Sequence, residues 1–122
     1  MRTVILTAAL MSFVVGLAMN AAEKTATVNG YVLDSACAFT KSLDKPVSRS
    51  CAISCAKGGS PLVILADDGS IYWPISSGTP AAGQNPKLLK FAGDRVTARG
   101  KVVERNGSRA IVIESIAPEA TK

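Results

Sequence analysis

The feature that most constrains the fold is the segment 94–116, which is centred on the Asn106-Gly107 pair. Asn-Gly is the preferred two-residue turn of a β-hairpin, because both positions of a type I′ turn need a left-handed backbone. A two-residue turn also fixes which residues of the two strands lie opposite one another. It predicts four cross-strand pairs: Val102 with Ile111, Gly100 with Ile113, Arg99 with Glu114, and Glu104 with Arg109.

The residue types along this segment agree with that register. Two of the four pairs join opposite charges, and cross-strand pairs of this kind contribute about 0.2–1 kcal/mol each. Alternate residues of the first strand share a face, and the two faces differ in polarity. The inner face carries Val96, Ala98, Gly100 and Val102, and the outer face carries Arg95, Thr97, Arg99 and Lys101.

Three more strands are expected before this hairpin. Alternating apolar residues predict a strand over 25–34, and Gly30 within it is typical of the bends by which a small barrel closes. The apolar run Leu62–Ala66 and the segment Ile71–Ile75 flank an Asp-Asp-Gly-Ser turn, so they predict a second hairpin. Pro74 lacks a backbone N–H and places the end of that strand at an edge.

A short helix is expected to begin after Ser48 or Ser50, either of which can cap its N-terminus. Gly58 ends it as a left-handed C-cap. The helix would place Cys51 and Cys55 one turn apart on the same face.

A second short helix is expected to begin at Asn85, with Asn85 as its cap and Pro86 at the first helical position. Gly93 would stop it. The segments 38–46 and 76–84 are expected to be loops, because they are polar or rich in Ser, Gly, Pro and Ala.

The order of these elements is strand, helix, strand, strand, helix and long hairpin. Five strands with glycine at the bends predict a mostly β protein, namely a small five-stranded OB-like barrel with two short helices. About 100 residues correspond to one domain, so we assign residues 23–122 to this barrel.

Residues 1–22 are expected to be a signal peptide. Arg2 supplies a positive charge, an apolar run from Val4 to Ala18 follows, and small residues precede the first acidic residue. The run is short for a membrane-spanning helix, although an uncleaved N-terminal anchor is the alternative. The leader predicts a periplasmic or secreted protein that meets the membrane only through this peptide before cleavage.

The chain contains no histidine, and this absence excludes Ser-His-Asp and Cys-His catalysis. A metal site could then use only sulfur and carboxylate ligands. The formal net charge of +5 is too small to indicate a nucleic-acid partner. Three aromatic side chains could stack on bases, but packing is the simpler interpretation of Tyr31, Tyr72 and Trp73.

The three cysteines support three interpretations. In an oxidising compartment, Cys37 at the end of the first strand could form a disulfide with Cys51 or Cys55. That bond would pin the helix to the barrel and stabilise the fold by about 3 kcal/mol. Alternatively, all three thiolates could bind Cu(I), or Zn(II) with Asp34 or water as a fourth ligand. In the third interpretation Cys51, in the first helical turn, is a redox-active thiolate.

The residues around the cysteines resemble a family of small, uncharacterised exported bacterial proteins with an OB-like barrel. The resemblance rests on D-x-x-C, C-x-x-x-C-x-x-G-G-x-P and a D-D-G turn, here Asp34, Cys37, Cys51, Cys55, Gly58, Gly59, Pro61, Asp67, Asp68 and Gly69. Members often carry a histidine three residues before the first helical cysteine, where this chain has Ser48. The resemblance implies the fold and the compartment, and a family metal site that used this histidine would have lost a ligand here.

The sequence therefore predicts an exported, non-enzymatic barrel that serves as a binding or stress-related module. A cysteine staples its helix to the barrel, and its ligand is unknown. The alternative is a thiolate metal-binding or thiol-redox protein of the cell envelope, with copper(I) or zinc at Cys37, Cys51 and Cys55. No catalytic residue is predicted.

Overall fold

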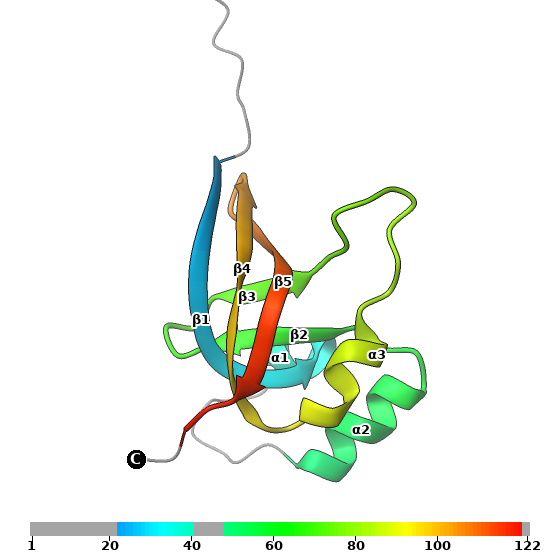
Figure 1. Ribbon diagram of the computed structural model, residues 1–122. Coiled ribbons are helices and arrows are strands. Elements are labelled where there is room, and N and C mark those ends of the chain that lie inside the picture. Colours follow the sequence, from blue (N-terminus) through cyan, green and yellow to red (C-terminus); the bar gives the residue numbers. More distant parts are fainter. Residues whose placement is uncertain (1–21, 41–47, 121–122) are drawn as a thin grey trace, which may run out of the picture.

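A computed structural model describes residues 22–40 and 48–120 of the chain. Its five strands form a closed barrel in the order β1-β2-β3-β5-β4, which confirms the predicted small five-stranded barrel (Figure 1). The strands are β1 (Ala22–Asp34), β2 (Leu62–Ala66), β3 (Ile71–Pro74), β4 (Arg95–Arg105) and β5 (Ser108–Pro118). The predicted signal peptide lies outside the described residues, apart from its last position.

Strand β1 is the longest and joins two sides of the barrel. Its first part pairs with β4 over 22–31, and its last part pairs with β2 over 30–34. Gly30 lies where the strand changes partner, and a Cβ atom there would lie 2.2 Å from the carbonyl oxygen of Leu65. The bend that the sequence predicted at Gly30 therefore requires a residue without a side chain.

The long hairpin follows its predicted register near the turn. Val102 lies opposite Ile111, Gly100 opposite Ile113, and Glu104 opposite Arg109. The Glu104–Arg109 pair forms an ion pair at 3.1 Å. Beyond Gly100 the prediction was wrong, because an irregularity shifts the register and Arg99 lies opposite Ser115 instead of Glu114.

Residues 22–40 and 48–120 contain three helices, where the sequence predicted two. Helix α1 (Ser35–Thr40) was missed, because its residues were assigned to the end of a strand and to a loop. Helix α2 (Arg49–Lys57) begins after the N-cap Ser48, which was one of the two predicted caps. The Ser48 hydroxyl accepts a hydrogen bond from the Cys51 N–H. Its C-terminal glycine was misassigned, because the left-handed residue is Gly59 (φ 99°) rather than Gly58 (φ −75°).

Helix α3 (Asn85–Leu88), followed by the 3-10 turn η1 (Leu89–Phe91), corrects the role predicted for Asn85. The N-cap position belongs to Gln84, and the Asn85 side chain instead contacts the chain before β2. Its amide oxygen accepts from the Leu62 N–H and its amide nitrogen donates to the Ser60 carbonyl, both at 2.8 Å. Asn85 thus ties α3 to the segment that follows α2.

We expect Asn85→Ala to lower the free energy of unfolding by about 2 kcal/mol, because a buried N–H and a carbonyl lose their partners. Urea unfolding would measure this change. Gln84→Ala is the matched control, because the Gln84 amide bonds only the exposed Ala82 carbonyl. Equal losses in the two variants would contradict the role assigned to Asn85.

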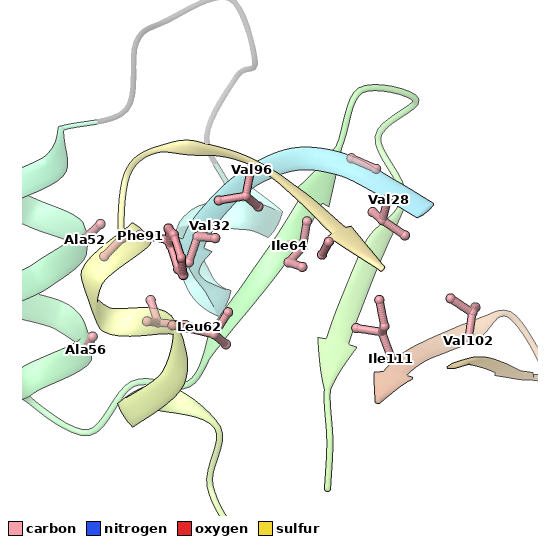
Figure 2. Packing of buried hydrophobic residues seen from close by; sticks show 14 residues of the cluster. Val28, Val32, Ala52, Ala56, Leu62, Ile64, Phe91, Val96, Val102 and Ile111 are labelled. Atoms are coloured by element: carbon pink, nitrogen blue, oxygen red, sulfur yellow. The ribbon is translucent and has the colours of Figure 1, made fainter. Parts of the chain in front are cut away.

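The main core fills the barrel and continues under α2 and η1. Four strand residues are fully buried in the interior of the barrel: Val32, Ile64, Val96 and Ile111. Figure 2 shows α2 beside this cluster, with its small residues Ala52 and Ala56 on the side that faces Phe91 and Leu62. A second, smaller cluster packs α1 on the outside of the barrel through Leu33, Ala38, Val63 and Leu65.

The helices in the described part of the chain are all too short to cross a membrane.

Candidate functional site

The structure places the three cysteines on two helices. Cys37 lies in α1, and Cys51 and Cys55 lie one turn apart in α2, so the prediction that Cys37 ends a strand was wrong in detail. Cys51 is exposed, and the other two thiols are half-buried. We refer to Cys37, Cys51 and Cys55 as the thiol cluster.

Asp34 is the buried acid beside the thiol cluster, with only 4% of its surface exposed. One carboxylate oxygen accepts a hydrogen bond of 2.8 Å from the Cys37 N–H, and the other accepts one from the Ser60 hydroxyl. Asp34 thereby caps the first turn of α1 at the point where β1 ends. The Ser60 hydrogen bond is the main reason that the pKa of Asp34 is lower than its ordinary value of 3.8, and the Cys37 hydrogen bonds act in the same direction against burial.

Cys37 is held in its protonated form by its surroundings. Burial is the largest cause that raises the pKa of Cys37 to about 11, followed by a hydrogen bond to Asp34 and the negative charge of that carboxylate. Charge on Cys51 and Cys55 raises the pKa of Cys37 further, which places both thiols within its electrostatic range. A reactive cysteine needs a lowered pKa, so Cys37 does not resemble a redox nucleophile.

Cys51 and Cys55 interact with each other along one face of α2. Burial raises the pKa of Cys55 above its usual value, and a hydrogen bond to Cys51 and the charge of Cys51 raise it further. A helical side chain leans toward the N-terminus, and this tilt brings residues four apart into contact. The two residues therefore lie on the same face of α2, with Cys51 exposed and Cys55 half-buried.

Contacts at both ends hold α2 in this position. At its start, Arg49 forms an ion pair with Asp94 and donates a 3.3 Å hydrogen bond to the Lys90 carbonyl. A Cβ atom on Gly93 would lie 2.6 Å from the Arg49 Cα, so a glycine is needed for this close approach. At the other end, the Ser60 N–H donates to the Cys55 carbonyl at 3.1 Å, and the Ser60 side chain reaches Asp34.

Sequence reasoning found the three cysteines and Asp34 but missed Ser60 and Asn85. Ser60 follows two glycines and precedes Pro61, so it stands at a fixed point after the helix. That position was the available signal, although its hydrogen bond spans 26 residues along the chain. Asn85 was interpreted as a helix cap, so its contacts with distant residues were not predicted.

Neither of the predicted cysteine bonding patterns is formed in the part of the chain that the structure describes. The three cysteines there are not disulfide-bonded. Within residues 22–40 and 48–120, no group of three or more His, Cys, Asp and Glu side chains has the arrangement of a metal site. The disulfide and the three-thiolate site therefore remain predictions, and each would require the thiols to move together.

Two of the three aromatic side chains considered for base stacking are engaged elsewhere, whereas Trp73 is exposed. The Arg95 guanidinium lies 5.0 Å from the centre of the Tyr31 ring and forms ion pairs with Asp67 and Glu119. Tyr72 packs against the main core. These contacts are structural, and the thiol cluster is the most chemically distinctive place on the molecule.

Comparison with known proteins does not add a family to this description. No family model matches the chain, and searches of the curated proteins and of the solved structures found no significant match to it.

Proposed function

We propose that this chain is an exported, non-enzymatic binding module whose working part is the thiol cluster, and that its ligand is a soft metal ion. The observation that carries the proposal is the placement of the three thiols on two short helices, with Cys51 and Cys55 one turn apart in α2 and Cys51 exposed to solvent. Thiolates are the preferred ligands of Cu(I) and also bind Zn(II). Because the chain has no histidine, sulfur is the natural donor for any such ion.

A small barrel suits this role, because it holds short helices rigidly at one end. Helices α2 and α3 and the 3-10 turn lie together beyond that end of the strands (Figure 1). The contacts of Arg49, Ser60 and Asn85 fix the backbone of these helices. The thiol side chains can therefore change rotamer to meet an ion while the helices stay in place.

The second candidate is a structural one, in which Cys37 forms a disulfide with Cys51 or Cys55. The contacts of Ser60 favour it, since its hydroxyl donates to Asp34 at the start of α1 and its N–H donates to the Cys55 carbonyl in α2. Such a bond would join α1 to α2 and leave one thiol unpaired. In this case the module would bind its ligand through another surface.

Intact mass spectrometry of the exported protein distinguishes the two candidates. We expect the native protein to retain one metal ion, and the denatured, unreduced protein to react with alkylating reagent at all three cysteines. A denatured mass lower by two hydrogens, with a single reactive thiol, would instead establish the disulfide. Three reactive thiols with no metal retained after incubation with Cu(I) or Zn(II) would contradict both. The same mass reports whether the predicted signal peptide is removed.

A further inference from the structure

We propose that Cys51 and Cys55 form a two-coordinate Cu(I) site on the exposed face of α2, and that Cys37 is not a ligand. This inference rests on the proposed function and specifies its metal and its ligands. The first step is the geometry of α2, in which Cys51 and Cys55 lie one turn apart on the same face of the helix. Cu(I) is satisfied by two thiolates on opposite sides of the ion, so this pair alone can bind it.

Cys37 is held back from the ion by its own contacts. Its N–H donates to the carboxylate of Asp34, which is buried and also bonded to Ser60. Cys37 lies in α1, so an ion shared by all three thiols would have to join two separate helices, and the described residues show no group of three ligands arranged for a metal. A metal-bound thiolate there would also lie beside the negative charge of Asp34 in a half-buried place, which is unfavourable.

Zn(II) fits the same place less well. It takes four ligands in a tetrahedral arrangement, and two thiolates supply only half of them. Asp34, the acid considered as a further ligand, already accepts hydrogen bonds at both oxygens, from Cys37 and from Ser60. The described residues contain no group of three or more ligands arranged for a metal, so the helical pair is the part of the cluster that needs the least rearrangement.

Binding at this pair is balanced in charge and protons. Cu(I) enters as a monovalent cation, two S–H bonds break, two Cu–S bonds form, and two protons leave to solvent. The copper stays in the Cu(I) state throughout, so no oxidant or reductant is consumed. The product carries one negative charge on an exposed helical face, where water can solvate it.

The test is a competition titration of the purified chain with Cu(I), supplied as its acetonitrile complex, against a colorimetric Cu(I) chelator in the absence of oxygen. We expect one Cu(I) per chain for the wild type and for Cys37→Ser, with affinities within about threefold of each other. Cys51→Ser and Cys55→Ser should each lower the affinity by more than about 100-fold, since losing a ligand exceeds the effect of outer contacts. Circular dichroism must show that each variant retains the barrel.

X-ray absorption of the loaded protein gives an independent readout, and we expect two sulfur neighbours for the copper. Three sulfur neighbours, or a loss in Cys37→Ser as large as that in Cys51→Ser, would overturn the two-coordinate site while leaving the proposed soft-metal function intact. Equal affinity for Zn(II) in the same competition would also overturn it. Failure of the wild type to bind either ion would remove both the inference and the proposed function.

Discussion

Replacing Gly30 by valine is expected to prevent the barrel from closing. The first side-chain atom would lie 2.2 Å from the Leu65 carbonyl oxygen and 2.8 Å from the Ala66 Cα, and both of these are backbone atoms of β2. Backbone atoms cannot move aside as the end of a flexible side chain can. Relief requires β1 and β2 to separate where β1 passes from one partner to the other.

Gly30→Val is expected to lower the free energy of unfolding by more than about 3 kcal/mol, which is the upper end of the usual range for overpacked cores. A domain of this size is stable by only about 5–15 kcal/mol, so the substitution should remove a large part of the stability and lower the melting temperature strongly. Thermal unfolding followed by circular dichroism measures the effect. Gly83→Ala is the control, because a Cβ atom there meets nothing within 4 Å. A normal melting temperature for Gly30→Val would show that the two strands do not approach as closely as described.

Replacing Asp34 by alanine should produce the second largest loss, about 3 kcal/mol in the free energy of unfolding. The Cys37 N–H and the Ser60 hydroxyl would both lose a charged acceptor, and hydrogen bonds to charged groups contribute about 1.5–3 kcal/mol. The same change would remove the cap of α1. Asp68→Ala is the matched control, because the Asp68 carboxylate is exposed and bonds the Ser70 N–H in a turn.

The loss in Asp34→Ala should depend on pH in a definite direction. The pKa of Asp34 is lowered in the folded chain, so the folded state binds fewer protons than the unfolded state near that pKa. The stabilisation by its charge is complete above the unfolded pKa of about 4 and is lost as the pH falls toward the folded value. Urea unfolding at several pH values between about 7 and 3 should therefore show the difference from wild type shrinking in acid. A difference that stayed constant would mean that the charge of Asp34 contributes nothing.

Local patterns were sufficient for most of the strands. The β2–β3 hairpin and the long β4–β5 hairpin have turn residues that specify both position and register, and four buried residues of the β4 inner face alternate as expected. The register failed only beyond Gly100, because a turn controls the pairing up to the next irregularity. A shift at that point depends on how the barrel closes, which the residues of the hairpin do not reveal.

Helix α1 was missed for a related reason. Six residues are too few to show a helical period, and the last three lie in the segment 38–46 that was expected to be a loop. Asp34 three residues before Cys37 is a usable N-cap signal, but it was interpreted as the end of a strand. Asp34 in fact serves both elements, and this dual role sets where Cys37 stands relative to α2.

The candidate site was predictable in its residues and only partly in its geometry. All three cysteines fall within 37–55, so any compact fold would bring them near one another. Their partners were harder to find, because Ser60 and Asn85 act through contacts with residues more than 20 positions away. Which thiol pairs with which neighbour depends on these long-range contacts rather than on cysteine spacing.

The Asn106–Gly107 turn has a practical consequence for studying this molecule. Both residues are exposed, with positive φ angles of 48° and 83°, and the turn projects from the end of the barrel away from α2 and α3 (Figure 1). Exposed loop tips of this kind accept inserted sequence better than any element interior. A fluorophore or an affinity tag grafted at this tip would leave α2 unobstructed, so immobilised protein could be tested for metal binding without masking the thiols of that helix.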